Sequence, residues 1–234
     1  MKVQPGGIAE VCYLCGLELQ NDRSVDHLPP KQFFARSLRA EINLSQLVTL
    51  PAHVSCNRSY GRDEQYFAWS LGPLAMASVA GAALVRDHAM GFRGGRARGL
   101  GHTVRREFER QPSGLHLPQG RVVKRVQGNR IARVAWKLVC VLFYSEHARV
   151  LSEDTPWMFD LIEPMRAEGV AGNALWEEVK AQPAKGVYPG VFDYKYFAGE
   201  IDGHLFHSWG MLLWDRWMLF AARHDSKTTD RGAV

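Results

Sequence analysis

The sequence predicts an α+β protein: a small N-terminal unit built around metal-ligand side chains, then helices, then a C-terminal α+β region with an antiparallel β-hairpin. Three observations favour this class. Two pairs of closely spaced cysteine and histidine residues lie in the first quarter of the chain. Apolar residues recur at helical spacing in the middle, and aromatic-rich runs separated by turn residues occupy the last third. We expect residues 1–90 to form one domain and residues 91–234 a second, which selects substrate, directs assembly or regulates.

Short elements separated by turns fill the chain from Val11 to Asn57. A helix is predicted over Pro30 to Arg39. Proline suits the first turn of a helix, because the N–H that it lacks would have no hydrogen-bond partner there. The next helical region runs from Asp63 to about Asp87, as one helix or as two joined at residues 72–73. Its residues 67–85 carry no charge and approach the length of a membrane span. They are rich in Ala, Gly and Ser, so a buried helical hairpin kinked at Pro73 is favoured.

The stretch Gly91 to His102 is rich in glycine and arginine, and it predicts a mobile basic loop that links the two domains. A strand is expected at G-R-V-V-K-R-V (residues 120–126). Helical periodicity is strongest from Asn129 to about His147, and Cys140 on that helix is expected to be a packing thiol. Beyond it, W-M-F-D-L-I and the runs on either side of G-E-I-D-G predict strands and a hairpin.

Composition sets the class and the compartment. Hydrophobic residues make up 46% of the chain and aromatic residues 11%, enough for a packed core. No secretory signal pattern opens the sequence, so we expect a cytoplasmic protein without a membrane anchor. In that reducing compartment, the clustered cysteines indicate metal binding rather than disulfides.

Positive charge is concentrated in the central segment of the sequence. Residues 86–137 carry thirteen Lys/Arg and three Asp/Glu, which gives +10, while residues 1–85 balance at seven of each and residues 138–234 carry nine against fourteen. A basic segment of this kind favours contacts with nucleic-acid phosphates.

The spacing Cys12-x-x-Cys15 followed by His53-x-x-Cys56 predicts a structural zinc site, because zinc takes four N/S ligands in a tetrahedron and none remains for substrate. The alternatives are ordinary buried thiols with a surface histidine, or a redox Cys-x-x-Cys pair, for which no thioredoxin-like pattern is present. If both pairs meet at one zinc, the Asp26-His27 dipeptide is held in the same unit as Asn57. On an extended segment these neighbours point in opposite directions, one towards a second metal and the other towards water.

C-Y-L-C-G, V-D-H-L-P-P and H-V-S-C-N-R-S-Y-G together resemble the HNH nucleases of the ββα-metal group, with the pattern C-x-x-C, D-H-x-x-P, C-x-x-C-N. The resemblance covers roughly Val11 to Phe67. His53 stands where many members have cysteine, which zinc accepts equally. The middle asparagine of the motif is matched by Asn43 or by Gln46.

The resemblance implies a zinc-containing ββα unit and a metal-dependent endonuclease that hydrolyses phosphodiester bonds in nucleic acid, with DNA as the expected substrate. His27 would be the general base, and Asp26 and Asn57 would hold one divalent cation, Mg²⁺ or Mn²⁺. Lys31, Arg58 and Arg62 are candidates for contacts to backbone phosphates, and the alternative is that they are solvated surface charges.

Plainer interpretations of the same residues remain: a surface Asp-His pair and Asn57 as a helix N-cap. Asp63 and Glu64 have two interpretations: they add a metal ligand through water, or they complement the dipole at a helix N-terminus. The competing functions are a non-catalytic, zinc-dependent nucleic-acid-binding module that uses residues 86–137, and a protein–protein adaptor built on the aromatic C-terminal region. A nuclease would also need strict specificity, an activating protein partner or a homo-oligomer to spare its host genome.

Overall fold

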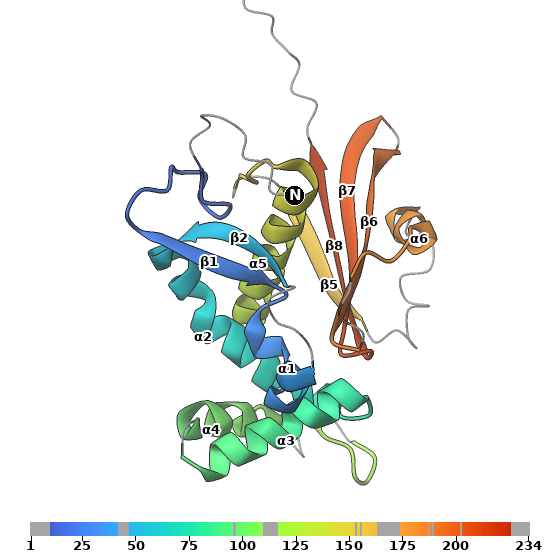
Figure 1. Ribbon diagram of the computed structural model, residues 1–234. Helices are drawn as coiled ribbons and strands as arrows, with labels where there is room; N and C mark the ends of the chain where they lie inside the picture. Colours follow the sequence, from blue (N-terminus) through green and yellow to red (C-terminus); the bar gives the residue numbers. More distant parts are fainter. Residues whose placement is uncertain are drawn as a thin grey trace, which may run out of the picture.

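The computed structural model describes residues 10–41, 47–95, 97–109, 117–152, 154, 156–162, 174–186, 188, 190–201 and 203–225. The fold is mixed α+β, with two small antiparallel strand pairs and a four-stranded antiparallel sheet near the C-terminus (Figure 1). The predicted α+β class is therefore confirmed. The candidates Asn43 and Gln46 lie outside the described residues.

The N-terminal unit is a strand, a strand and a helix. Strand β1 (Arg23–Leu28) pairs antiparallel with β2 (Val48–His53), and helix α2 (Val54–Leu71) begins at the residue after β2. Between the strands lie the short helices η1 (Lys31–Phe33) and α1 (Arg36–Glu41). The single helix predicted over residues 30–39 is wrong, because residue 34 has an extended backbone that separates these two pieces.

Helix α2 ends where the sequence predicts a kink. It is followed by η3 (Gly72–Ala75), which contains Pro73, and then by α3 (Val79–Arg93). Residues 67–85 thus belong to two helices that are joined at the predicted break, although Met76 and Val79 between and at the start of them are exposed rather than buried. Among the described residues, no helix combines the length and the apolar character needed to cross a membrane.

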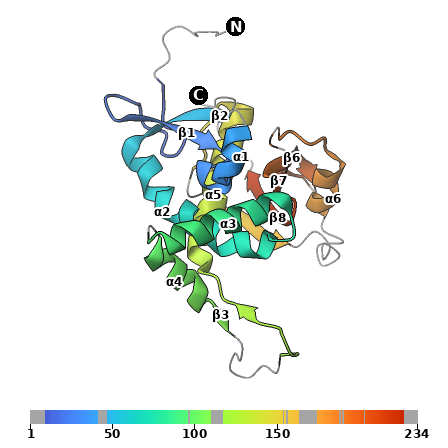
Figure 2. The ribbon, with the colours of Figure 1, turned by 60° about the horizontal axis from the view of Figure 1, so that its bottom comes forward.

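The predicted mobile loop at residues 91–102 is wrong. Helix α3 extends to Arg93, and helix α4 (Arg98–Arg106) begins soon after it. The glycine at position 101 serves packing rather than flexibility, since a Cβ there would lie 2.3 Å from the ring of Phe92. Helices α3 and α4 pack side by side across the C-terminal end of α2 (Figures 1 and 2).

The long helix α5 (Gly128–His147) lies between the β1–β2 pair and the C-terminal sheet (Figure 1). Its periodic apolar residues are buried, and Cys140 is among them as a packing thiol, as predicted. Before it, β3 (Phe108–Glu109) and β4 (Val123–Lys124) form a short pair, so the strand expected at residues 120–126 is only two residues long.

The C-terminal sheet has the strand order β5-β8-β7-β6. Its strands are β5 (Trp157–Ile162), β6 (Phe192–Ile201), β7 (His204–Leu213) and β8 (Trp217–Asp225), so the predicted hairpin is present as β6–β7. Helix α6 (Ala174–Ala181), which was not predicted, packs on this sheet through Trp176 against Phe220. The indole N–H of Trp214 donates to the Phe33 carbonyl (2.9 Å), and one hydrophobic core includes residues from both sides of residue 90.

Candidate metal centre and catalytic site

Cys12, Cys15, His53 and Cys56 meet at one point, although 37 residues separate the two pairs in the sequence. Each offers one ligand atom, and these atoms all lie within 4.8 Å of one another. Gly16 closes the first turn: its φ of +75° suits glycine, and its N–H donates to the Cys12 carbonyl (2.8 Å). The second pair spans the junction of β2 and α2, with His53 as the residue that precedes the helix.

The imidazole of His53 is oriented for metal binding. Its Nδ1 lies 3.3 Å from the Cys15 sulfur and 3.9 Å from the Cys56 sulfur, while its Nε2 lies 3.2 Å from the Glu18 carbonyl oxygen. A proton on Nε2 therefore donates to that carbonyl and leaves the Nδ1 lone pair facing the sulfurs. Zinc-ligating histidines are held in this way, with the second ring nitrogen donating to an oxygen.

The surroundings of the cluster shift the pKa values of two of its thiols in opposite directions. Burial and the neighbouring Cys12 sulfur raise the pKa of Cys56 to about 12. Burial also raises the pKa of the Cys12 thiol, but hydrogen bonds, first from the His53 backbone N–H, outweigh it and leave that pKa lowered. In a tetrahedron with Zn–S bonds of about 2.3 Å, donors lie roughly 3.5–3.8 Å apart. Here the His53 Nδ1 lies 3.3 and 3.9 Å from two of the sulfurs, and all four ligand atoms lie within 4.8 Å of one another. The four side chains thus form a Cys3His group positioned like a structural zinc site.

The zinc turn also holds Asp26. Tyr13, the residue after the first cysteine ligand, is fully buried, and its hydroxyl donates to Oδ2 of Asp26. Burial, and then the Asp26 charge, raise the pKa of Tyr13 well above its ordinary value, so the hydroxyl remains a donor. The other carboxylate oxygen of Asp26 accepts the backbone N–H of His27 (2.8 Å). Tyr13 was missed by the sequence analysis because a tyrosine between two cysteine ligands carries no signal of its own.

Asn57 lies next to Asp26, as the sequence analysis expected of a shared site. The terminal amide atom that faces Asp26 lies 3.3 Å from each of its carboxylate oxygens and 3.3 Å from Nζ of Lys137. An amide nitrogen in this position donates to Asp26, and an amide oxygen accepts from Lys137. The alternative interpretation of Asn57 as an N-cap is wrong, because α2 begins at Val54.

Glu64 joins the site from the same face of α2, seven residues after Asn57. Its side chain is 5% exposed and forms an ion pair with Lys137. Burial raises the pKa of Glu64, and the Lys137 ammonium opposes that shift. The suggested role of residues 63–64 at a helix N-terminus is wrong, because both lie beyond the second turn of α2.

Lys137 is the residue that the sequence analysis did not anticipate at this site. It comes from α5, is 1% exposed, and places its ammonium 2.6 Å from Oδ2 of Asp26. The ammonium also lies 5.5 Å from the centre of the Tyr60 ring. The only signal for it in the sequence is one charged residue inside the apolar run A-W-K-L-V-C.

His27 is half-buried on β1, opposite Thr49 of β2. Burial and then the positive charge of Lys31 lower its pKa, while Asp26 opposes the shift. The imidazole is therefore neutral near pH 7 and can accept a proton. Its side chain has no hydrogen-bond partner within the part of the chain that the structure describes.

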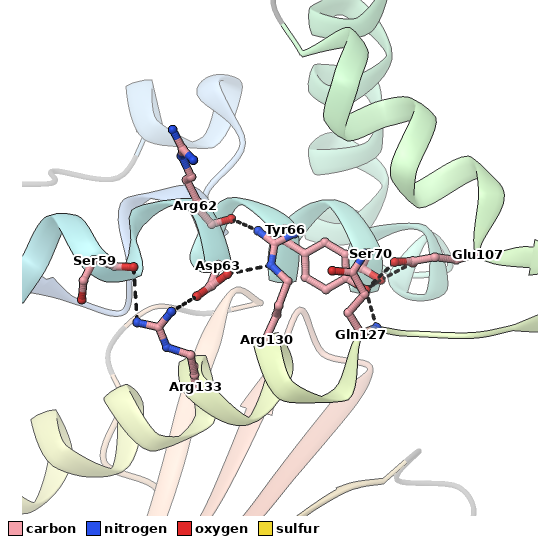
Figure 3. Close-up of polar contacts among 9 residues, drawn as sticks. All are labelled: Ser59, Arg62, Asp63, Tyr66, Ser70, Glu107, Gln127, Arg130 and Arg133. Atoms are coloured by element: carbon pink, nitrogen blue, oxygen red, sulfur yellow. Dashed lines mark hydrogen bonds and ion pairs between the residues drawn. The ribbon is translucent and has the colours of Figure 1, made fainter. Parts of the chain in front are cut away.

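The three residues predicted to contact phosphates, Lys31, Arg58 and Arg62, are exposed. Arg62 follows Gly61 on α2, and Figure 3 shows its side chain pointing away from the neighbouring Asp63 network. No ion pair to these three side chains is present among the described residues, which leaves their charges available to a ligand.

Some of the basic side chains of residues 86–137 form ion pairs within the protein. Arg130 and Arg133 of α5 pair with Asp63 of α2 at 2.6 and 2.7 Å (Figure 3). Lys124 of β4 pairs with buried Glu107 at 2.5 Å. In contrast, six described arginines of the segment are exposed, without ion pairs to other described residues: Arg86, Arg93, Arg98, Arg105, Arg106 and Arg121.

Glu107 anchors the junction of α2, α4 and α5. Its carboxylate accepts hydrogen bonds from the hydroxyls of Tyr66 and Ser70, and Tyr66 in turn accepts the backbone N–H of Gln127 at 2.7 Å (Figure 3). Together with Asp63, these contacts fix α5 against α2 and so determine where Lys137 enters the site.

Comparison of the chain with protein-family models, with curated proteins and with solved structures gives no match.

Proposed function

We propose that this protein is an endonuclease of the HNH type that hydrolyses phosphodiester bonds in nucleic acid, with DNA as the expected substrate. The observation that carries the proposal is the meeting of Asp26 and Asn57, 31 residues apart, beside His27 in a strand–strand–helix unit joined by a Cys3His group. The sequence resemblance implies that these three residues share one site. The reduced thiols of that group also favour the cytoplasm.

The reaction requires a base for the attacking water and positive charge beside the phosphate. His27 supplies the base, since burial lowers its pKa and keeps the imidazole neutral at pH 7. Asp26 is held in place by Tyr13 and supports the segment that carries His27. Lys31, Arg58 and Arg62 are exposed around the unit and would bind backbone phosphates on either side of the cut.

The divalent cation implied by the resemblance would need oxygens from Asp26 and Asn57. These groups face the ammonium of Lys137 at 2.6 and 3.3 Å. Mg²⁺ or Mn²⁺ therefore does not fit this arrangement of side chains, and the proposed roles of His27 and the exposed cations do not depend on it.

The test is a cleavage assay on supercoiled plasmid, single-stranded DNA and RNA, in Mg²⁺, in Mn²⁺ and without added divalent ion. We expect cutting in at least one condition and its loss in His27→Ala. The matched control is His204→Ala, which removes an exposed histidine from β7 of the C-terminal sheet. Cutting that survives in His27→Ala, or no cutting by the wild-type protein in any condition, would sink the proposal.

A non-catalytic nucleic-acid-binding module is the second candidate. It is favoured by the exposed arginines of α3 and α4, which lie beyond the end of α2 (Figure 2). This function predicts binding that weakens steeply with salt, falls in Arg105→Ala/Arg106→Ala, and is unchanged in His27→Ala. Binding without cleavage in the assay above would select it.

A further inference from the structure

A buried lysine occupies the place where the sequence resemblance puts a divalent cation. The ammonium of Lys137 lies 2.6 Å from Oδ2 of Asp26 and contacts Oε1 of Glu64. The terminal amide atom of Asn57 that faces Asp26 is 3.3 Å away. These three side chains come from two elements of the N-terminal unit, and the lysine comes from α5, at least 73 residues further along the chain.

The lysine is paired with two carboxylates. An ammonium carries three N–H donors, and here it lies against carboxylate oxygens of Asp26 and Glu64. Burying a charged lysine costs several kcal/mol unless such partners are present. With its side chain 2% exposed, Lys137 has exchanged water for this cluster, so the ion pairs are part of the packed core.

A divalent ion in the same place would compete with Lys137 for the same oxygens. Mg²⁺ requires oxygen ligands at about 2.0–2.1 Å and keeps much of its own water shell. Oδ2 of Asp26 already accepts from Tyr13 and forms an ion pair with Lys137, and Oδ1 accepts the N–H of His27. A second cation at this carboxylate would lie within a few ångströms of the ammonium in a low-dielectric setting, where like charges repel strongly.

We propose that Lys137 is the resident cation of this site and excludes divalent ions from Asp26, Asn57 and Glu64 in the folded protein. The inference deepens the proposed function, because it concerns the same site, and it assigns control of metal access to α5 in the second half of the chain. Removal of the ammonium should open a new divalent-ion site with two carboxylates and an amide oxygen.

Mn²⁺ binding to the zinc-loaded protein tests this directly, with free Mn²⁺ counted by electron paramagnetic resonance. We expect Lys137→Ala to bind Mn²⁺ at least about tenfold more tightly than the wild type. Adding Asp26→Asn to the Lys137→Ala variant should abolish this gain in Mn²⁺ affinity. The matched control is Lys185→Ala, which removes another lysine from a carboxylate partner, Glu146, outside the site. It should bind Mn²⁺ as the wild type does.

Two outcomes overturn the proposal. One is wild-type Mn²⁺ binding that is lost in Asp26→Asn and is as tight as in Lys137→Ala. The other is a Lys137→Ala protein that is folded by circular dichroism yet gains no Mn²⁺ site. If Lys137→Ala does not fold, the Mn²⁺ affinity of Lys137→Gln is compared with that of the wild type instead, and the same two outcomes overturn the proposal. DNA cleavage is not read in this experiment, so failure of the nuclease proposal and failure of this one are distinguishable.

Discussion

Removal of one zinc ligand should destabilise the whole N-terminal unit. The perturbation is Cys15→Ala, which deletes an exposed sulfur and so costs little packing. Structural zinc contributes about 10–16 kcal/mol in small zinc-binding peptides, which is comparable to the entire stability of a typical domain, about 5–15 kcal/mol. The cysteine turn is otherwise attached mainly through the Val11–Glu18 bridge and a few hydrogen bonds, including that of Tyr13.

Even partial loss of the zinc contribution should be measurable as a fall in melting temperature. Loss of only about 4 kcal/mol would lower the melting temperature by roughly 8–16 °C for a chain of this size. The matched control is Cys140→Ala, which removes the buried thiol of α5 that lies outside the Cys3His group. A change of that size in a core costs about 1 kcal/mol, or roughly 2–4 °C, and should leave the zinc content unchanged.

The assay is zinc content by mass spectrometry under native conditions, combined with calorimetric melting. Wild type and Cys140→Ala should each retain a single zinc, and Cys15→Ala should lose most of it. Equal zinc content in all three proteins, or equal melting shifts for the two variants, would refute the assignment of the Cys3His group as a structural zinc site.

Two further predictions concern stability. Asp63→Ala leaves Arg130 and half-exposed Arg133 without their carboxylate, and we expect a loss of about 1–3 kcal/mol in urea unfolding, since part of the pairing is screened by solvent. His88 stacks on Trp69, and its burial lowers its pKa to about 4, from 6.5. The unfolded chain therefore binds more protons between these pH values, so stability should fall by about 3 kcal/mol as pH drops from 6.5 to 4.

The controls isolate each effect. Glu177→Ala removes an exposed carboxylate that pairs with Lys180 on α6, and it should change stability by less than about 0.5 kcal/mol. A cost equal to that of Asp63→Ala would contradict the importance of the α2–α5 contact. His88→Phe keeps the ring stack and removes the titrating group, so its stability should fall less with acid than that of the wild type. Parallel pH profiles would rule out the histidine as the cause.

Local sequence was sufficient for the features whose cause is local. The equal spacings of Cys12/Cys15 and His53/Cys56 were enough to predict the ligand group, because two short turns must each present two donors to one ion. The periodic apolar residues of α5 and the turn between β6 and β7 predicted their elements for the same reason. The α+β class followed from these patterns.

Packing between distant segments decided the rest. The glycines near residue 100 predicted a loop, but close contact with the Phe92 ring favours glycine inside a helix pair. The sequence could place Asp26 and Asn57 near each other through the zinc, yet Tyr13 and Lys137 became part of the site only through tertiary contacts. A lysine in an apolar helix is buried only where carboxylates from other elements neutralise it, and those partners are 73 or more residues away.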